Sequence, residues 1–212
     1  MDWKELMTPE NIISLSTWLA TIIGALFLAW KSFKKKLDAY LDGSGSNVSG
    51  KIKQQSDIDL DIIKKMEEVK EILNADRVQV FEFHNGGHYA NGRSALKTTC
   101  TYETCRYGVK SYQTHLSSIP LSCIPKFIGA LLDEGKLCVS CLKDMENTMP
   151  ATYALKKSMQ INSFFDMIIK NKQGDPVGFV AIQFCTNKYN INEEVVQKLV
   201  WFLEEKLASS MA

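Results

Sequence analysis

Six cysteines and three histidines are the side chains of this 212-residue sequence best suited to metal binding or redox chemistry. Cys138 and Cys141 form a Cys-x-x-Cys pair, whereas Cys100 and Cys105 lie five residues apart. Residues three apart on a β-strand point to opposite faces of the sheet, so Cys138 and Cys141 need a turn between them to share one metal. The sequence has neither a second Cys-x-x-Cys nor a His pair at zinc-finger spacing. We therefore expect no metal site.

The other reactive side chains indicate neither an active site nor a prosthetic group. Most cysteines lie in apolar stretches, where a free thiol behaves as a small hydrophobic side chain, and disulfide bonds would require an extracellular domain. His84 and His88 lie in a Gly-rich stretch, 84–92, where a solvent-facing role is expected rather than haem ligation. The net charge of +1 gives no concentrated basic surface for nucleic acid. We expect a non-enzymatic protein with no cofactor and no nucleic-acid partner.

The segment Ile12–Trp30 contains no charged residue. As a helix, its nineteen residues would be about 28 Å long, close to the thickness of the hydrocarbon layer of a bilayer. Lys31, Lys34, Lys35 and Lys36 follow at once, and the positive-inside rule places them in the cytoplasm. The alternative is a helix buried on all sides in a soluble core. We predict a single-pass anchor in the inner membrane with the C-terminal domain in the cytoplasm.

The sequence accordingly divides into four parts. Residues 1–11 form a short extracytoplasmic N-terminus, and residues 12–30 form the transmembrane helix. Residues 31–50 are a basic juxtamembrane segment that ends in the Gly/Ser linker Gly43–Gly50, which has too few apolar side chains to pack. Residues 51–212 form the folded domain. The juxtamembrane lysines either contact anionic lipid headgroups or only fix the topology.

Hydrophobic periodicity in the domain predicts helices and strands in a mixed order. Apolar residues spaced by four and three indicate an amphipathic helix over 58–74, and a second such helix closes the domain. A turn with Gly and Asp joins the last two strands into a hairpin. The predicted order is helix 58–74, strands 77–84 and 95–107, a helix within 119–134, strand 136–142, helix 150–159, strands 161–170 and 176–185, and helix 192–207. This is an α+β fold, an antiparallel sheet flanked by helices.

The start of the first strand resembles that of a GAF domain, a sensory module related to PAS domains. Ala75, Asp76 and Arg77 lie between the first helix and an alternating strand, and GAF sequences commonly have this Ala-Asp-Arg order. The resemblance covers about residues 56–207 and implies a GAF-like fold, with the PAS class as the alternative.

A second motif lies before the last helix and is also similar to the GAF pattern. Asn187-Lys188 and Glu193-Glu194 match the Asn-Lys and Asp-Glu pairs of many GAF domains, with Ile191 where a Phe is usual and with shorter spacing. In the family this motif is chiefly a structural clasp. The match therefore bears on the fold more than on a ligand.

The resemblance also implies a small-molecule pocket between one face of the sheet and the helices and loops that cover it. By position, its expected lining is Phe83, Asn85, Tyr102, Phe127, Phe165 and Asp166. Asp166 interrupts an apolar strand, and exposure on the outer face is the favoured interpretation; a polar contact in the pocket is the alternative. Phytochrome-type GAF domains attach bilin through a Cys beside a His, a pair that this sequence lacks.

The expected function is that of a membrane-anchored regulatory module that senses a small molecule or binds a partner protein without catalysis. One alternative is a small membrane scaffold, for instance a phage-encoded one, whose GAF-like domain binds protein and no ligand. Another is a cysteine-based reductase of the free methionine sulfoxide reductase type, for which Cys123 would be the candidate. The glycine-flanked cysteine pattern of that family is missing.

The first and last helices of the domain predict self-association. Their apolar stripes are Ile62, Met66, Val69 and Leu73 on the first and Val196, Leu199 and Leu203 on the last. Val195, Val200 and Phe202 extend the second stripe beyond the width needed to cover a sheet. We expect a parallel homodimer that packs these helices together.

Overall fold

The computed structural model describes residues 18, 22–36, 48–186 and 188–209. The chain divides into two compact units, Met1–Gln54 and Gln55–Ala212.

In the first unit, Trp18 and residues 22–36 are helical. Trp18 and Trp30 are 70% and 65% exposed, respectively. The predicted span Ile12–Trp30 lies partly outside the described residues; within the part that the structure describes, no helix is both long and apolar enough to cross a membrane. The predicted linker also lies partly outside that part. Its last residues, 48–50, are helical, so the expectation of an irregular segment is wrong there, because they continue the first helix of the domain.

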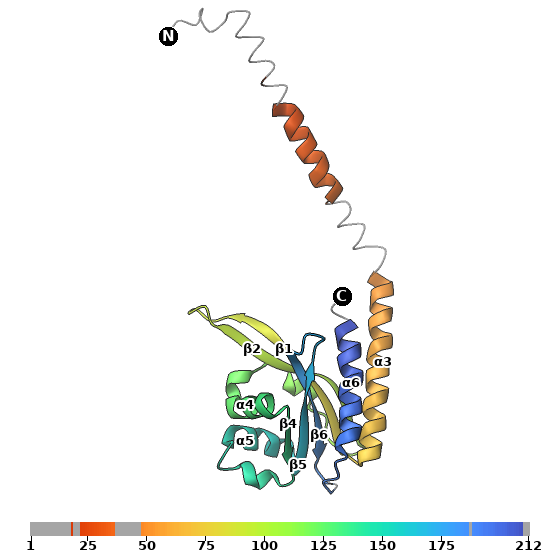
Figure 1. Cartoon of the computed structure of the whole chain (residues 1–212), viewed down its shortest axis with the longest axis vertical. Coiled ribbons are helices and arrows are strands. Elements are labelled where there is room, and N and C mark those ends of the chain that lie inside the picture. The colour runs from red at the N-terminus through yellow and green to blue at the C-terminus, as the bar shows by residue number, and fades with distance from the viewer. Residues whose placement is uncertain (1–17, 19–21, 37–47, 187, 210–212) are drawn as a thin grey trace, which may run out of the picture. The chain divides into compact units, whose positions relative to one another are not determined.

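The second unit contains a six-stranded antiparallel sheet (Figure 1). The strands are β1 (Arg77–His88), β2 (Ser94–Cys105), β3 (Ile119–Pro120), β4 (Lys136–Val139), β5 (Ser163–Lys170) and β6 (Pro176–Phe184). Their order across the sheet is β3-β2-β1-β6-β5-β4. The predicted hairpin β5–β6 therefore lies inside the sheet and pairs on both sides.

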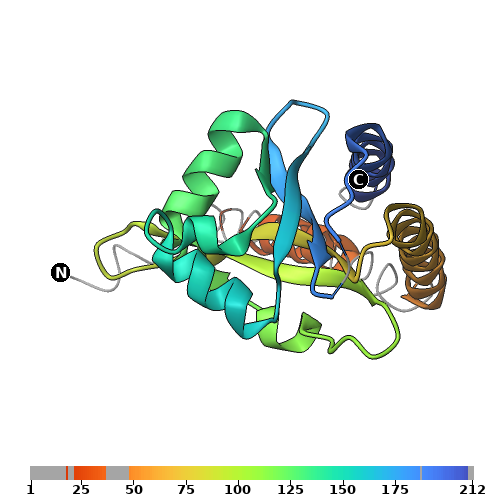
Figure 2. The same ribbon diagram turned by 90° about the horizontal axis from the view of Figure 1, so that it is seen from below.

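Helices cover both faces of the sheet, as Figure 2 shows. One face carries α3 (Val48–Leu73) and α6 (Glu193–Ser209), and the other carries α4 (Pro125–Glu134) and α5 (Pro150–Ser158). Three short 3-10 helices, η1 (Gln113–Leu116), η2 (Leu121–Cys123) and η3 (Leu142–Met145), lie in the connections. The α+β architecture predicted from the sequence is confirmed.

The core beneath α3 and α6 follows from the alternation of the strands. The buried members of the predicted helix stripes pack there against one face of β1, β5 and β6, at Val78, Val80, Phe165, Met167, Ile169, Val180, Ile182 and Phe184. The two helices run antiparallel: Lys206 Nζ lies 2.8 Å from Asp61 Oδ2, and Asn190 Nδ2 donates to the carbonyl of Leu73 at the end of α3. Val200 is 1% exposed in this core, so the predicted excess of apolar width on α6 is wrong at that residue.

The core beneath α4 and α5 is rich in aromatic side chains. Phe81 of β1 stacks on Phe179 of β6 with ring centroids 4.6 Å apart, and Phe127 of α4 meets Phe179 edge-on at 5.8 Å. The strands approach closely here, because a Cβ at Gly178 would lie 2.0 Å from the carbonyl oxygen of Phe81. Gly178 therefore permits the β1–β6 pairing on which this aromatic layer rests.

Strand β1 extends beyond its predicted bounds. Strand β1 continues to His88, so most of the predicted loop 84–92 belongs to a hairpin that extends beyond the helices (Figure 1). The glycines allow this, since Gly87 has φ +98° and a Cβ at Gly86 would collide with Lys97. Helix α4 is followed by its C-cap Gly135 in the left-handed conformation.

The segment before α6 and the start of the helix contain the four predicted motif residues, Asn187, Lys188, Glu193 and Glu194. Asn187 lies outside the described residues, and Lys188 is exposed. Glu193 pairs with Lys136, and Glu194 pairs with Lys198 on its own helix. Asn192 caps α6 by accepting the backbone N–H of Glu194 at 3.1 Å.

The Ala-Asp-Arg motif at the start of β1 has a clear structural role. Asp76 is fully buried, and its Oδ2 accepts the backbone N–H groups of Cys185 and Thr186, each at 2.7 Å. This carboxylate fixes the chain where it leaves β6. Arg77 belongs to a polar network on the α4–α5 face, as described below.

Candidate ligand-binding cavity

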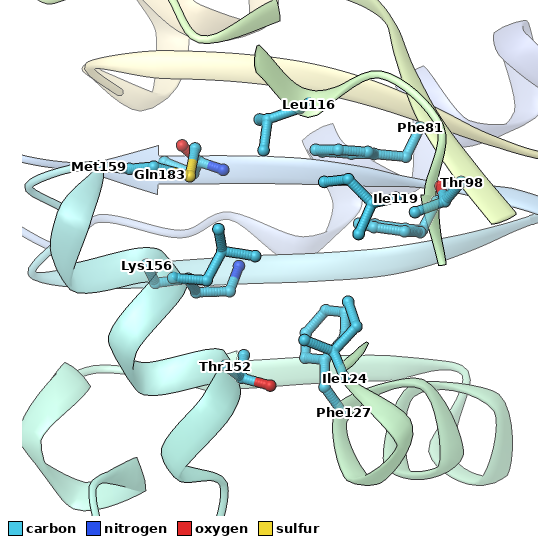
Figure 3. A pocket seen from close by; sticks show the side chains of 12 residues that line it. Phe81, Thr98, Leu116, Ile119, Ile124, Phe127, Thr152, Lys156, Met159 and Gln183 are labelled. Atoms are coloured by element: carbon cyan, nitrogen blue, oxygen red, sulfur yellow. The ribbon is translucent and has the colours of Figure 1, made fainter. Parts of the chain in front are cut away.

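A small cavity lies between the sheet and helices α4 and α5 (Figure 3). Its volume is about 40 Å³, and its walls come from the sheet, η1, α4 and α5. The lining side chains are Phe81, Thr98, Leu116, Ile119, Ile124, Phe127, Thr152, Leu155, Lys156, Met159, Phe179 and Gln183. Apolar and aromatic groups predominate, and Lys156 is the single charged member of this lining.

Lys156 extends from α5 toward the sheet with 7% of its surface exposed. Its Nζ donates to Oδ2 of Asp166 at 2.9 Å and lies 3.6 Å from the centroid of the Phe164 ring. The ring of Phe127 is 5.2 Å away on the α4 side. Two aromatic faces and one carboxylate thus surround the ammonium group. Helix geometry explains its direction, since Lys156 follows the buried Thr152 by four residues on one helix face.

Asp166 lies in the middle of β5 and is fully buried. Its Oδ1 has no hydrogen-bond partner among the described residues. Burial raises the pKa of Asp166, and the Lys156 ammonium opposes that shift. The outer-face position favoured by the sequence is wrong, because α5 covers this face of β5 and supplies Lys156 as the partner.

A polar network forms the wall at Gln183. The Oε1 atom of Gln183 accepts from Arg77 Nη1 at 2.8 Å, and its Nε2 donates to Gln79 Oε1 at 2.6 Å. Gln79 in turn donates to Glu103 Oε1, which lies 3.5 Å from Arg77 Nε. The amide of Gln183 is therefore held in one orientation and leaves Lys156 as the main polar group at the cavity.

An apolar groove of about 210 Å³ lies beside the cavity, between the first turns of α4 and α5. Ile124 and Thr152 line both spaces, so these two side chains separate the groove from the cavity. Each helix begins with a proline, Pro125 or Pro150, which favours helix initiation at that residue. The groove ends at these two side chains, which stand between it and the cavity that Lys156 lines.

The structure brings together only part of the lining expected from the sequence. Phe127 lines the cavity, Asp166 reaches it through Lys156, and Phe83 packs at its edge, with its ring 5.9 Å from that of Phe179. Asn85 is exposed on the β1–β2 hairpin, where its side chain accepts the Gly87 N–H.

Tyr102 and Phe165 lie on the other side of the sheet, so their predicted place in the lining is wrong. Phe165 packs beneath α3 and α6. The Tyr102 hydroxyl donates to Asp59 Oδ1 on α3 at 2.7 Å. For Phe165 the strand period gives the reason, since it adjoins Asp166 and must face the opposite way. The same period could have excluded it from any pocket that contains Asp166.

Sequence reasoning missed Lys156, the most informative side chain of the cavity. The sequence feature that could have indicated it is a lysine in a short predicted helix together with an isolated Asp in an apolar strand. Long-range pairing of that kind is not visible in local periodicity. Thr152 and Phe179 were missed for the same reason, because their contact with the cavity depends on how α5 and β6 are placed.

The cysteines lie apart from the cavity chemistry. Cys138 and Cys141 are exposed, and the Cys138 thiol shares a hydrogen bond of 2.6 Å with the Tyr189 hydroxyl. Cys100 is buried, and burial raises the pKa of its thiol. Across the described residues, no group of three or more His, Cys, Asp or Glu side chains could hold a metal ion.

Comparisons with known proteins identify the architecture. No family model matches the sequence, and no curated protein matches it. Solved structures do match: the PixJ GAF domain of Thermosynechococcus elongatus is 10% identical, with a TM-score of 0.56 over 74% of this chain and 88% of that one. The phycoerythrobilin-bound GAF domain of a cyanobacterial phytochrome is 18% identical, with a TM-score of 0.55 over 78% of this chain and 92% of that one.

The fold is a GAF fold. A third structure, a phycocyanobilin-bound GAF domain of a cyanobacterial phytochrome, agrees at 16% identity and a TM-score of 0.53 over 78% of this chain and 90% of that one. At these identities the likeness concerns the fold alone. The GAF resemblance of the Ala-Asp-Arg motif is consistent with it.

Proposed function

We propose that the GAF fold of this chain is a sensory or regulatory domain that binds a small molecule in the α4–α5 cavity without catalysis. The observation that carries the proposal is the Lys156–Asp166 pair, a charged group at the wall of a cavity in an otherwise apolar layer. A buried ion pair contributes little net stability, so stability alone gives a weak reason for its presence. Concave apolar sites with a few polar groups are the usual form of small-molecule sites.

Bilin is not the ligand that these residues favour. Two of the similar solved structures are described as bilin-bound. The cavity of about 40 Å³ is far smaller than the roughly 300–1,000 Å³ of pockets for drug-sized ligands. The thiols in this layer, Cys100 and Cys185, are buried, whereas His84 is exposed on the projecting hairpin. The residues therefore do not fit an attached tetrapyrrole, and the proposed ligand is smaller.

We also propose that the domain is anchored to the inner membrane and faces the cytoplasm. The support is the uncharged segment Ile12–Trp30 and the lysines that follow it. An anchored sensor without catalysis acts by changing its contacts with another protein or with a second copy of itself. The proposed homodimer provides one such contact.

Native mass spectrometry of the full-length chain in detergent tests the binding function. We expect a small bound mass that is lost from Lys156→Met. As a matched control, Lys157→Met should retain it, because Lys157 is exposed and its Nζ contacts Tyr153. If the wild type carries no small molecule and no metabolite extract raises its melting temperature, the ligand-binding function is wrong.

The second candidate is a ligand-free scaffold, which the small volume of the cavity favours. A side chain that fills the cavity separates the two functions. Thr152→Leu places a larger apolar group between groove and cavity, so it should block a ligand and leave a scaffold unaffected. Retention of in vivo function by Thr152→Leu would support the scaffold.

A further inference from the structure

The Lys156 ammonium has hydrogen-bonding capacity that the protein does not use. An ammonium group has three N–H donors. Among the described residues, Lys156 Nζ donates to one acceptor, Asp166 Oδ2, and its other close neighbours are the rings of Phe164 and Phe127. Because Lys156 lines the cavity, a ligand there can reach a donor that is already fixed in position (Figure 3). The polar end of the ligand should therefore be an acceptor or an anion.

The rest of the cavity calls for a short apolar body. Phe81, Phe179 and Ile119 line it on the sheet side. A single water needs about 10–15 Å³ of the same kind of volume, so about 40 Å³ accommodates roughly three. Each water occupies about 30 Å³ in the liquid. A ligand that takes the place of roughly three waters therefore has on the order of three to six non-hydrogen atoms.

We propose, on the basis of the small-molecule function above, that the cavity binds a short-chain aliphatic carboxylic acid. Its carboxylate accepts a hydrogen bond from Lys156 Nζ, and its alkyl chain packs against Phe81, Phe179 and Ile119. The ligand carboxylate thereby becomes the counter-ion of Lys156 in place of Asp166.

Charge balance then requires a proton. The ionised pair of Lys156 and Asp166 has no net charge, and a bare carboxylate would add one negative charge to a site without water. The neutral acid avoids that cost: its proton passes to the Asp166 carboxylate, and the resulting anion pairs with Lys156. One O–H bond breaks and one forms, so a ligand anion from solution binds together with one proton.

The surroundings of Asp166 make it the proton acceptor. Its Oδ1 has no partner among the described residues, and burial already raises its pKa. Helix α5 presents Lys156 to it, α4 presents Phe127 to Lys156, and β6 places Ala181 opposite it. The Tyr189 phenol also interacts with Asp166 electrostatically, and the pKa of Tyr189 is raised, so Tyr189 stays neutral.

Isothermal titration of the full-length chain in detergent with butyrate tests this inference. Titrations in two buffers of different ionisation enthalpy report proton uptake, for which we expect about one proton per butyrate. Over the pH range in which free butyrate and Asp166 are both ionised, affinity should rise about tenfold for each unit by which pH falls. Butylamine, which has the same chain with a cation, should not bind.

Three variants make the test specific. Lys156→Met should weaken butyrate binding at least tenfold, whereas Lys157→Met should not change it. Asp166→Asn should bind butyrate without proton uptake and with little pH dependence, because the neutral amide leaves Lys156 in need of a counter-ion. This third variant keeps the inference testable if Lys156→Met does not fold.

The outcomes separate this inference from the proposed function. If butyrate does not bind but another small molecule binds in a Lys156-dependent way, the ligand class is wrong and the sensory function stands. If butyrate binds Lys156→Met as well as the wild type, or binds without a proton, the assigned site is wrong. If no small molecule binds at all, both proposals fail.

Discussion

At the scale of single residues, Lys156 and Asp166 interact inside an apolar layer. Taking two charges out of water costs several kcal/mol, which their attraction offsets only in part. Removing one partner leaves the other charge unpaired, so we expect Lys156→Met to lower the free energy of unfolding by about 3–5 kcal/mol. The double variant Lys156→Met, Asp166→Leu should recover most of that loss, because both charges are gone. Urea unfolding of the wild type and of all variants measures these free energies of unfolding. Similar losses of free energy in Lys156→Met and in the double variant would contradict the expected recovery.

The pH dependence of stability gives a second test of Asp166. Burial raises its pKa above the value of about 3.9 for an unfolded aspartate, so the folded state holds the proton more tightly. Its stabilising contribution is thus complete below about pH 3.9 and is lost as pH rises through the folded pKa. We expect the difference in unfolding free energy, wild type minus Asp166→Asn, to decrease from pH 3.5 to 7. A difference that increases would mean that Lys156 lowers the pKa of Asp166.

Arg77 and Glu103 form a second buried ion pair on the α4–α5 face. Glu103 accepts the backbone N–H groups of Tyr112 and Gln113, so the cluster holds the loop before η1 against the sheet. Arg77→Met should cost about 3–5 kcal/mol and increase hydrogen exchange at those two amides. Lys198→Met is the control, because Lys198 and its partner Glu194 are both exposed, so it should cost less than about 1 kcal/mol. Equal costs would show that Arg77 has no special role.

At the scale of elements, the last helix shows how far periodicity can predict a surface. The stripe Val196, Leu199 and Leu203 was predicted and is buried. The sequence could not show that α6 packs against both α3 and the sheet, so that more than one side of the helix is enclosed. Val200 is buried for that reason, and Val195 and Phe202 pack partly against the same core. Trp201, which periodicity did not single out, is the exposed large apolar residue on this helix at 59%.

Neighbouring substitutions on α6 test the dimer and the core separately. Val200→Glu buries a charge, so it should destabilise the domain by about 4 kcal/mol or more. Trp201→Glu places the same charge on the exposed side and should leave the unfolding transition within about 1 kcal/mol of the wild type. If α6 forms part of a dimer interface, Trp201→Glu should also shift the dimer toward monomer in light scattering. A wild-type chain that is monomeric at high micromolar concentration contradicts the homodimer.

The same contrast between local and long-range information explains the candidate site. Helices α4 and α5 and the hairpin β5–β6 could be predicted because their capping residues, turns and periods are local. Strand alternation could predict that Phe165 and Asp166 face opposite sides of the sheet. The pairing of Asp166 with Lys156 could not be predicted in this way, because it depends on the position of α5 on the sheet. The extent of β1 was missed because glycines in a strand and glycines in a loop look alike in sequence.

At the scale of the whole molecule, we expect the two compact units to have separate roles. Residues 55–212 contain both hydrophobic cores and the cavity, so folding of this domain should not depend on the first unit. A chain of residues 51–212 should therefore be soluble and unfold in one cooperative transition. Circular dichroism during urea unfolding measures this, and a broad, non-cooperative loss of structure would contradict it.

Membrane attachment should depend on the first unit alone. The uncharged segment Ile12–Trp30 has the length of a membrane span, and the described part of it exposes apolar side chains such as Phe27 and Leu28. We expect the full-length chain to stay in the membrane fraction after alkaline carbonate extraction. A chain with Ile23→Lys and Phe27→Lys should be released, because two charges near the centre of a span each cost about 2.5–3.5 kcal/mol on insertion scales. A fluorescent reporter that matures only in the cytoplasm, fused after Ala212, should be active. Extraction of the wild type by carbonate would exclude a span, and an inactive reporter on a membrane-bound chain would reverse the orientation.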